Sequence, residues 1–66
     1  MWYEILEILE ISSNNIHLEW NPKSWEEVEE KRAKLTELLG SYEDATEVVN
    51  LAMIGELTIL TNKYPY

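Results

Sequence analysis

The 66-residue sequence contains no cysteine and only five lysine and arginine residues. The lack of cysteine excludes disulfides, thiolate nucleophiles and cysteine-ligated metal sites. Thirteen acidic residues outnumber the five basic ones, which gives a formal charge of −8 and a pI near 4.4. This balance argues against binding to DNA, RNA or an anionic membrane surface, because each of these requires a basic face.

Glycine, long apolar runs and N-terminal positive charge are also scarce. The two glycines, Gly40 and Gly55, stand too far apart to form a phosphate-binding loop. No apolar run approaches the roughly 18 residues that cross a bilayer, and the first residues, Met-Trp-Tyr-Glu, lack the basic region of a signal peptide. We therefore expect a cytoplasmic protein, located in the host cytoplasm if its source is viral.

Apolar residues make up 45% of the chain, which is too many for a disordered acidic segment. The length fits a single domain, residues 1–66, in which residues 62–66 form a tail. A core of this size stabilises a fold only narrowly. We therefore expect additional stability from self-association or from a partner.

The first segment, Trp2 to Ile11, has apolar residues interrupted by glutamate at every third position. This spacing fits neither a strand nor a helix cleanly, and we assign a strand with a bulge near Glu7. Residues 12–15, Ser-Ser-Asn-Asn, are typical of a turn. Residues 16–21 then alternate between apolar and polar side chains, which predicts a second strand.

A helix is predicted from Trp25 to Leu39. Ser24 and Glu27 have the spacing of a capping box at its start, and Gly40 closes it. Its core face is predicted to hold four apolar residues: Trp25, Val28, Leu35 and Leu39. On the exposed side, two ion pairs are expected at i,i+4 spacing, Glu27 with Lys31 and Glu30 with Lys34.

A second helix is predicted from Glu43 to Ile54, capped by Ser41 or Asp44, although the adjacent pair Val48-Val49 leaves a strand open. Residues 57–61 are predicted as a third strand. The resulting order, ββααβ, indicates an α+β fold: a three-stranded antiparallel sheet with a helical hairpin packed on one face.

The sequence offers few groups for catalysis or metal binding. His17 is the only histidine and shares a predicted strand face with Glu19, and we interpret the two as an exposed hairpin face rather than an acid–base pair. Asp44 is the only aspartate, and neither a calcium loop nor a zinc-ligand pair occurs. We predict a non-enzymatic protein without a metal or cofactor.

The negative charge is concentrated in the first half of the chain. Residues 1–30 hold eight acids and one base, a net −7, whereas residues 31–66 hold five acids and four bases, a net −1. Four carboxylates in residues 26–30 fall within about 6 Å of helix axis, a charge density similar to that of duplex DNA. Glutamate is also favoured in any first helical turn by the helix dipole, and Lys31, Arg32 and Lys34 interrupt the acidity, so a solvated helix start is the competing interpretation.

All large aromatic residues carry a polar group, because the chain has three tryptophans, four tyrosines and no phenylalanine. Such residues are enriched at protein interfaces. Trp20 and Trp25 are predicted to pack together in the core, whereas Tyr64 and Tyr66 lie in the predicted tail and are candidate anchors for a partner.

These features predict a protein-binding inhibitor or regulator. Small, acidic and free of cysteine, the chain is similar in general character to phage-encoded inhibitors, and an anti-defence or anti-CRISPR protein that mimics nucleic acid on a basic partner surface is the most concrete version. The alternatives are an assembly module, such as a homodimer, an antitoxin-like partner or a complex subunit, whose acidity confers solubility, and a small hydrolase that uses His17. The predicted partner-binding residues are Glu4, Glu7, Glu10, Glu19, Glu26, Glu27, Glu29, Glu30, Tyr64 and Tyr66.

Overall fold

The computed structural model describes residues 1–12 and 18–64, which form three α-helices and one 3₁₀ turn. The elements in chain order are α1 (Trp2–Leu9), α2 (Trp25–Leu39), α3 (Tyr42–Met53) and η1 (Leu57–Leu60). These residues contain no strand, so the predicted α+β fold with a three-stranded antiparallel sheet is wrong. The predicted helical hairpin is present as α2 and α3.

The first segment is a helix, not a strand, because its buried residues follow the helical period. Ile5, Leu6 and Leu9 lie in the core, whereas Glu4 and Glu7 are exposed. Glu10 ends α1 in the left-handed conformation with φ 58°. The Ile11 amide N–H then donates to the Leu6 carbonyl oxygen at 2.9 Å, the closure typical of a helix C-terminus.

The two other predicted strands also have different structures. Residues 13–17, which carry most of the turn predicted at residues 12–15 and the start of the second strand, lie outside the described residues. At the end of that segment Trp20 is buried, and its amide N–H donates to the Ala52 carbonyl oxygen of α3 at 2.9 Å. Residues 57–60 form η1 because Leu57 and Leu60, three residues apart, share the buried side of a 3₁₀ turn and leave Ile59 exposed.

The hairpin of α2 and α3 closely matches the prediction. Gly40 ends α2 with φ 72°, and its amide N–H donates to the Thr36 carbonyl oxygen at 2.8 Å. Val28 and Leu35 of α2 are buried as predicted. The core face of α3 consists of Ala45, Val48, Val49 and Ala52.

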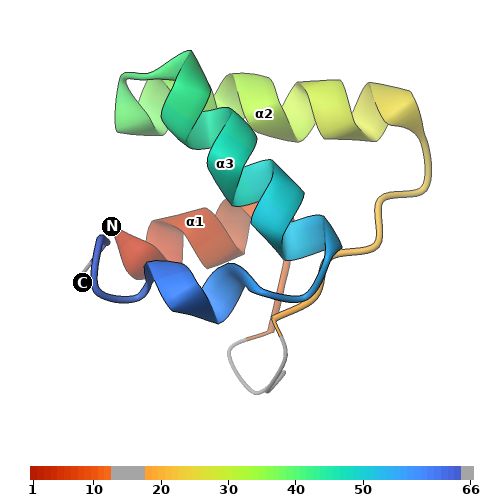
Figure 1. Cartoon of the computed structure of the whole chain (residues 1–66). Coiled ribbons are helices and arrows are strands. Elements are labelled where there is room, and N and C mark those ends of the chain that lie inside the picture. Colours follow the sequence, from red (N-terminus) through yellow and green to blue (C-terminus); the bar gives the residue numbers. More distant parts are fainter. Residues whose placement is uncertain (13–17, 65–66) are drawn as a thin grey trace.

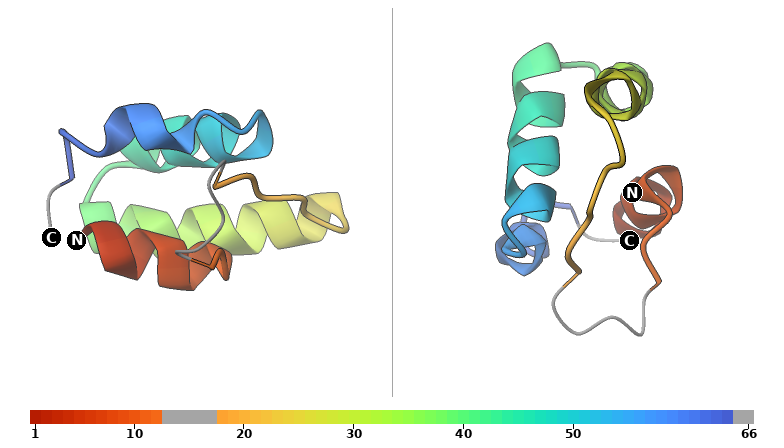
Figure 2. Two further views of the ribbon diagram at one scale, coloured as in Figure 1. Left: turned by 90° about the horizontal axis from the view of Figure 1, so that it is seen from below. Right: turned by 90° about the vertical axis from the view of Figure 1, so that its right-hand side faces the viewer.

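The elements form two layers with the segment of residues 18–24 between them. One layer contains α1 and α2, and the other contains α3 and η1 (Figure 2). The start of α2 extends past the other helices at the right of Figure 1. At this end of α2, Ser24, Trp25 and Glu26 are exposed and Glu27 is half-buried.

An ion pair between a buried lysine and an exposed glutamate joins the end of α1 to α2. The Lys31 side chain is 8% exposed, and its Nζ lies 3.4 Å from Oε1 of Glu10 and 4.0 Å from Oε1 of Glu30. The predicted pair of Glu27 with Lys31 is therefore not the one formed, because Lys31 turns toward α1. The predicted pair of Glu30 with Lys34 is confirmed, at 3.7 Å.

Candidate binding surface

The first turn of α2, named here the α2 start, comprises Ser24, Trp25, Glu26 and Glu27. The Ser24 hydroxyl accepts a hydrogen bond from the Glu27 amide N–H at 3.2 Å, which fixes the helix N-terminus as predicted. The Trp25 side chain is 68% exposed. The prediction that Trp25 lies in the core against Trp20 is therefore wrong, because the α2 start extends beyond the helices that would cover it.

The first turn of α3, named here the α3 start, repeats this pattern as Ser41, Tyr42, Glu43 and Asp44. The Ser41 hydroxyl accepts from the Asp44 amide N–H, also at 3.2 Å. Each start thus places an aromatic residue first in the helix and acids at the second and third positions. The two starts have the same sequence order and the same cap.

Two cations of the same chain contact the α3 start, one at Tyr42 and one at Asp44, whereas Glu43 forms no ion pair with a described cation. The guanidinium of Arg32 lies over the Tyr42 ring, with Cζ 5.2 Å from the ring centroid, and also pairs with Glu29. The Lys63 ammonium pairs with Asp44 at 3.4 Å and with Glu47 at 3.1 Å.

The α2 start has acids and an aromatic ring, but none of the described cations contacts them. Within residues 1–12 and 18–64, no lysine or arginine lies over the Trp25 ring, and none pairs with Glu26 or Glu27. Lys23, the cation nearest to it in sequence, is exposed and forms no ion pair with a described carboxylate.

The predicted acidic cluster of residues 26–30 divides into two parts. Glu29 pairs with Arg32 one turn further along α2, and Glu30 pairs with Lys34 one turn further and lies 4.0 Å from the adjacent Lys31. Glu26 and Glu27 form no ion pair with a described cation. The DNA-like charge density was expected from four carboxylates, and two of these four have a described cation as partner.

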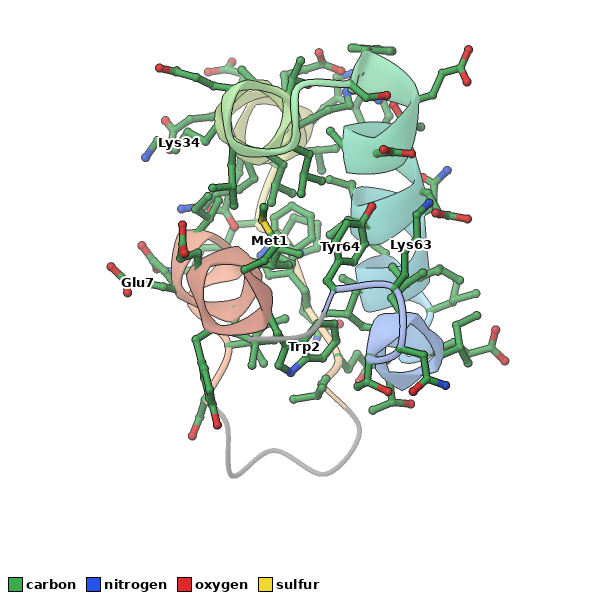
Figure 3. All side chains as sticks on the ribbon, turned by 90° about the vertical axis from the view of Figure 1, so that its left-hand side faces the viewer. Met1, Trp2, Glu7, Lys34, Lys63 and Tyr64 are labelled. Atoms are coloured by element: carbon green, nitrogen blue, oxygen red, sulfur yellow. The ribbon has the colours of Figure 1, made fainter. Side chains whose placement is uncertain are left out.

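The remaining predicted acids also divide into those with a described cationic partner and those without one. Glu4 lies 3.6 Å from the N-terminal amino group, and Glu10 pairs with Lys31. Glu7 is exposed on α1 and points outward, on the same side of the molecule as Lys34 (Figure 3). Glu19 is exposed, with its side chain beside Gly55.

The prediction that Tyr64 is an exposed anchor for a partner is wrong. Tyr64 is 8% exposed and lies between α1 and α3 near Met1 (Figure 3), so its ring belongs to the core and not to the surface. Burial raises the pKa of its phenol above the ordinary value of 10.0. Tyr66 lies outside the described residues.

Lys63 holds this C-terminal segment against α3. Its hydrogen bond to Glu47 raises the pKa of the ammonium well above the ordinary 10.5, and the bond to Asp44 acts in the same direction. Lys63 also lies 5.5 Å from the centroid of the Tyr64 ring. Sequence reasoning missed this role of Lys63, and no local pattern signals it, because its partners Asp44 and Glu47 lie 19 and 16 residues away in the chain.

The described residues contain neither a candidate metal-binding cluster nor a candidate membrane-spanning helix. In the part of the chain that it describes, no cluster of three histidine or acidic side chains is arranged to hold a metal ion. None of the described helices has the length and apolar character needed to cross a membrane. His17, and with it the His17–Glu19 pair, lies outside the described residues.

No known protein family, curated protein or solved structure matches this chain.

Proposed function

We propose that the protein is a non-enzymatic inhibitor or regulator that binds the basic surface of a protein partner through the α2 start. The observation that supports this proposal is the contrast between the two helix starts: Tyr42 and Asp44 of the α3 start contact cations of the same chain, whereas no described cation contacts Trp25, Glu26 or Glu27. A partner with a basic nucleic-acid-binding surface supplies the missing cations. An anti-defence protein of the anti-CRISPR type is the most concrete form of this function.

The acids on α1 and in residues 18–20 extend the negative field around this surface. Glu7 and Glu19 are exposed and form no ion pair with a described cation. A net charge of −8 on a domain of 7.8 kDa also accelerates encounter with a basic partner, an effect that decreases with ionic strength.

Affinity capture from the source cell tests this function. We expect a captured protein with a basic surface that is released at about 0.5 M NaCl and is displaced by excess polynucleotide. The double variant Glu26→Gln/Glu27→Gln weakens capture, whereas the control Glu37→Gln/Glu56→Gln removes the same charge from exposed positions elsewhere and retains it. A captured protein that resists salt and binds both variants equally contradicts the proposal.

A second candidate function is assembly into a homodimer or a larger complex. The exposed side chains of Ile54 and Ile59, 62% and 64% accessible at the α3–η1 connection, favour it. Light scattering at micromolar concentration distinguishes the two functions. A dimer that the variant Ile54→Ser/Ile59→Ser converts to monomer supports assembly, and a monomeric parent protein contradicts it.

A further inference from the structure

Leu18 adopts a backbone conformation that leucine rarely takes. Its φ is 49°, in the left-handed region, and its side chain is buried. Glu10 also has a positive φ, but it ends a helix, where this conformation is common, whereas Leu18 lies outside the described helices. In the left-handed conformation Cβ comes too close to the following carbonyl oxygen. The connection between α1 and α2 is therefore strained at Leu18.

The element before this strained residue, α1, is a short terminal helix that lies beside α2 (Figure 2). Its apolar residues Ile5, Leu6 and Leu9 are buried and belong to the core. The hydrogen bonds at its two ends stay within the helix segment, since the Ile5 N–H donates to the Met1 carbonyl oxygen and the Ile11 N–H to that of Leu6. These bonds are kept when α1 moves as a unit.

The ion pair between Glu10 and Lys31 marks the position at which α1 docks. Lys31 Nζ lies 3.4 Å from Oε1 of Glu10, and the two residues are 21 positions apart in the chain. The lysine is buried on α2, beside the apolar surface that α1 covers. A second copy of the chain offers the same lysine and the same apolar surface, so it accepts α1 with the same contacts.

We propose that the protein exchanges α1 between two copies and forms a domain-swapped dimer. In each half of this dimer, α1 of one copy packs on α2 of the other, and Glu10 of one copy pairs with Lys31 of the other. Leu18 leaves the left-handed conformation, because the chain crosses to the second copy instead of returning to its own α2. Exchange thus keeps the contacts of the monomer and releases its strain, and strained connections favour domain swapping.

The length and the charge of the chain set the conditions for exchange. The seven residues from Ile11 to Leu18 span at most about 25 Å, and the molecule measures 16 Å along its shortest axis. A net charge of −8 on each copy opposes close approach, and salt screens this repulsion. We therefore expect the exchanged dimer at high protein concentration in high salt, and the monomer in dilute solution.

A pair of charge-reversal variants tests the exchange. Glu10→Lys and Lys31→Glu each place like charges at the contact between α1 and α2, in the monomer and in a dimer of identical copies. When the two variants are mixed, exchange brings opposite charges together in both halves of the dimer. We expect each variant alone to stay monomeric and the mixture to form a one-to-one dimer, measured by analytical ultracentrifugation and native mass spectrometry. Folded variants that stay monomeric when mixed overturn the proposal.

Two substitutions of Leu18 test the strain without changing any charge. Leu18→Gly and Leu18→Ala both remove the buried side chain, but glycine adopts the left-handed conformation without steric cost. We expect the dimer of Leu18→Gly to be weaker than that of Leu18→Ala by about tenfold or more, because each dimer contains this residue twice. Equal dissociation constants overturn the role of Leu18. A parent protein that stays monomeric at millimolar concentration in high salt overturns the exchange.

NMR of mixed dimers distinguishes exchange from association through Ile54 and Ile59. Labelled and unlabelled copies of the parent protein are unfolded together in urea, refolded and concentrated. Exchange predicts intermolecular contacts between the methyl groups of α1 in one copy and those of α2 in the other, and these contacts persist in Ile54→Ser/Ile59→Ser. Intermolecular contacts confined to the α3–η1 connection, or a dimer that this double variant abolishes, overturn the exchange.

Discussion

The starts of α2 and α3 share a sequence pattern and a cap but differ in what surrounds them. At the α3 start, Arg32 covers the Tyr42 ring and Lys63 pairs with Asp44, whereas Glu43 has no described partner. At the α2 start, the described chain supplies neither cation. The local sequence therefore determines how each helix begins, whereas the neighbouring elements determine whether its first turn is satisfied within the protein.

The two helices also share three positions of buried residues, and α3 buries Val49 in addition. Counted from the capping serine, Val28 corresponds to Ala45 and Leu35 to Ala52, and all four are buried. One buried position differs in kind, where Lys31 of α2 corresponds to Val48 of α3. At this position α2 uses a charge to hold α1, and α3 uses a hydrocarbon side chain to fill the core.

The largest expected effect is at this differing position. Glu10→Gln should lower the free energy of unfolding by about 1–2 kcal/mol, because the Lys31 ammonium stays buried and loses its nearest carboxylate, while the exposure of Glu10 limits the loss. Lys31→Met should cost less, about 0.5 kcal/mol, since it leaves only the exposed Glu10 carboxylate in water. Urea unfolding followed by tryptophan fluorescence measures both values, and a Lys31→Met loss equal to or greater than that of Glu10→Gln would contradict this account.

The next effect tests whether the cation at the α3 start contributes to stability. Arg32→Met should reduce the free energy of unfolding by about 1 kcal/mol, because the contact with Tyr42 and the ion pair with Glu29 are both lost. At the α2 start, Trp25→Ala should change it by less than about 0.5 kcal/mol, since the side chain is mostly exposed. The comparison fails if the Trp25→Ala loss reaches that of Arg32→Met.

The caps should behave alike if the two helices begin in the same way. Ser24→Ala and Ser41→Ala should each cost close to 1 kcal/mol, because each removes one hydrogen bond of equal length to a first-turn amide. Thermal and urea unfolding of the two variants, measured together, provide the values. A large difference between them would mean that the shared pattern conceals different helix starts.

Sequence reasoning identified the helical hairpin because its signals are local. The serine caps, the terminal Gly40 and the spacing of Val28 and Leu35 all act within one helix. The same reasoning failed for residues 2–11. The left-handed conformation that ends α1 at Glu10, a residue that rarely adopts it, has no local sequence signal, and the Lys31 contact that accompanies it comes from 21 residues away.

Only part of the candidate surface was predicted from the sequence, because its charges are a local property and its contacts are not. Charge counting located the carboxylates of residues 26–30, but compensation of Glu29 and Glu30 depends on side-chain geometry along α2. The exposure of Trp25 depends on where α1 and α3 end relative to α2. A helical projection places Trp25 on the core face without showing that the core does not reach it.

The smallest expected effect is a loss of folding stability at alkaline pH, caused by Lys63 at the α3 start and by the neighbouring Tyr64. The pKa values of Lys63 and Tyr64 are both raised in the folded protein, so the folded state binds more protons than the unfolded state above about pH 10. Stability from these groups is present in full below pH 10 and decreases as the pH rises through the folded-state pKa values. Urea unfolding between pH 9 and about 11.5 should show this decrease.

Two variants show which titrating groups cause the loss of stability at alkaline pH. Tyr64→Phe removes the titrating phenol and should make the decrease shallower, and Lys63→Arg replaces the ammonium with a guanidinium that stays protonated over this range. Trp25→Leu at the α2 start should leave the pH dependence unchanged, because no titrating cation is held there by the described chain. A decrease that persists in the combined Tyr64→Phe/Lys63→Arg variant would place the titrating group elsewhere and remove the alkaline sensitivity from the α3 start.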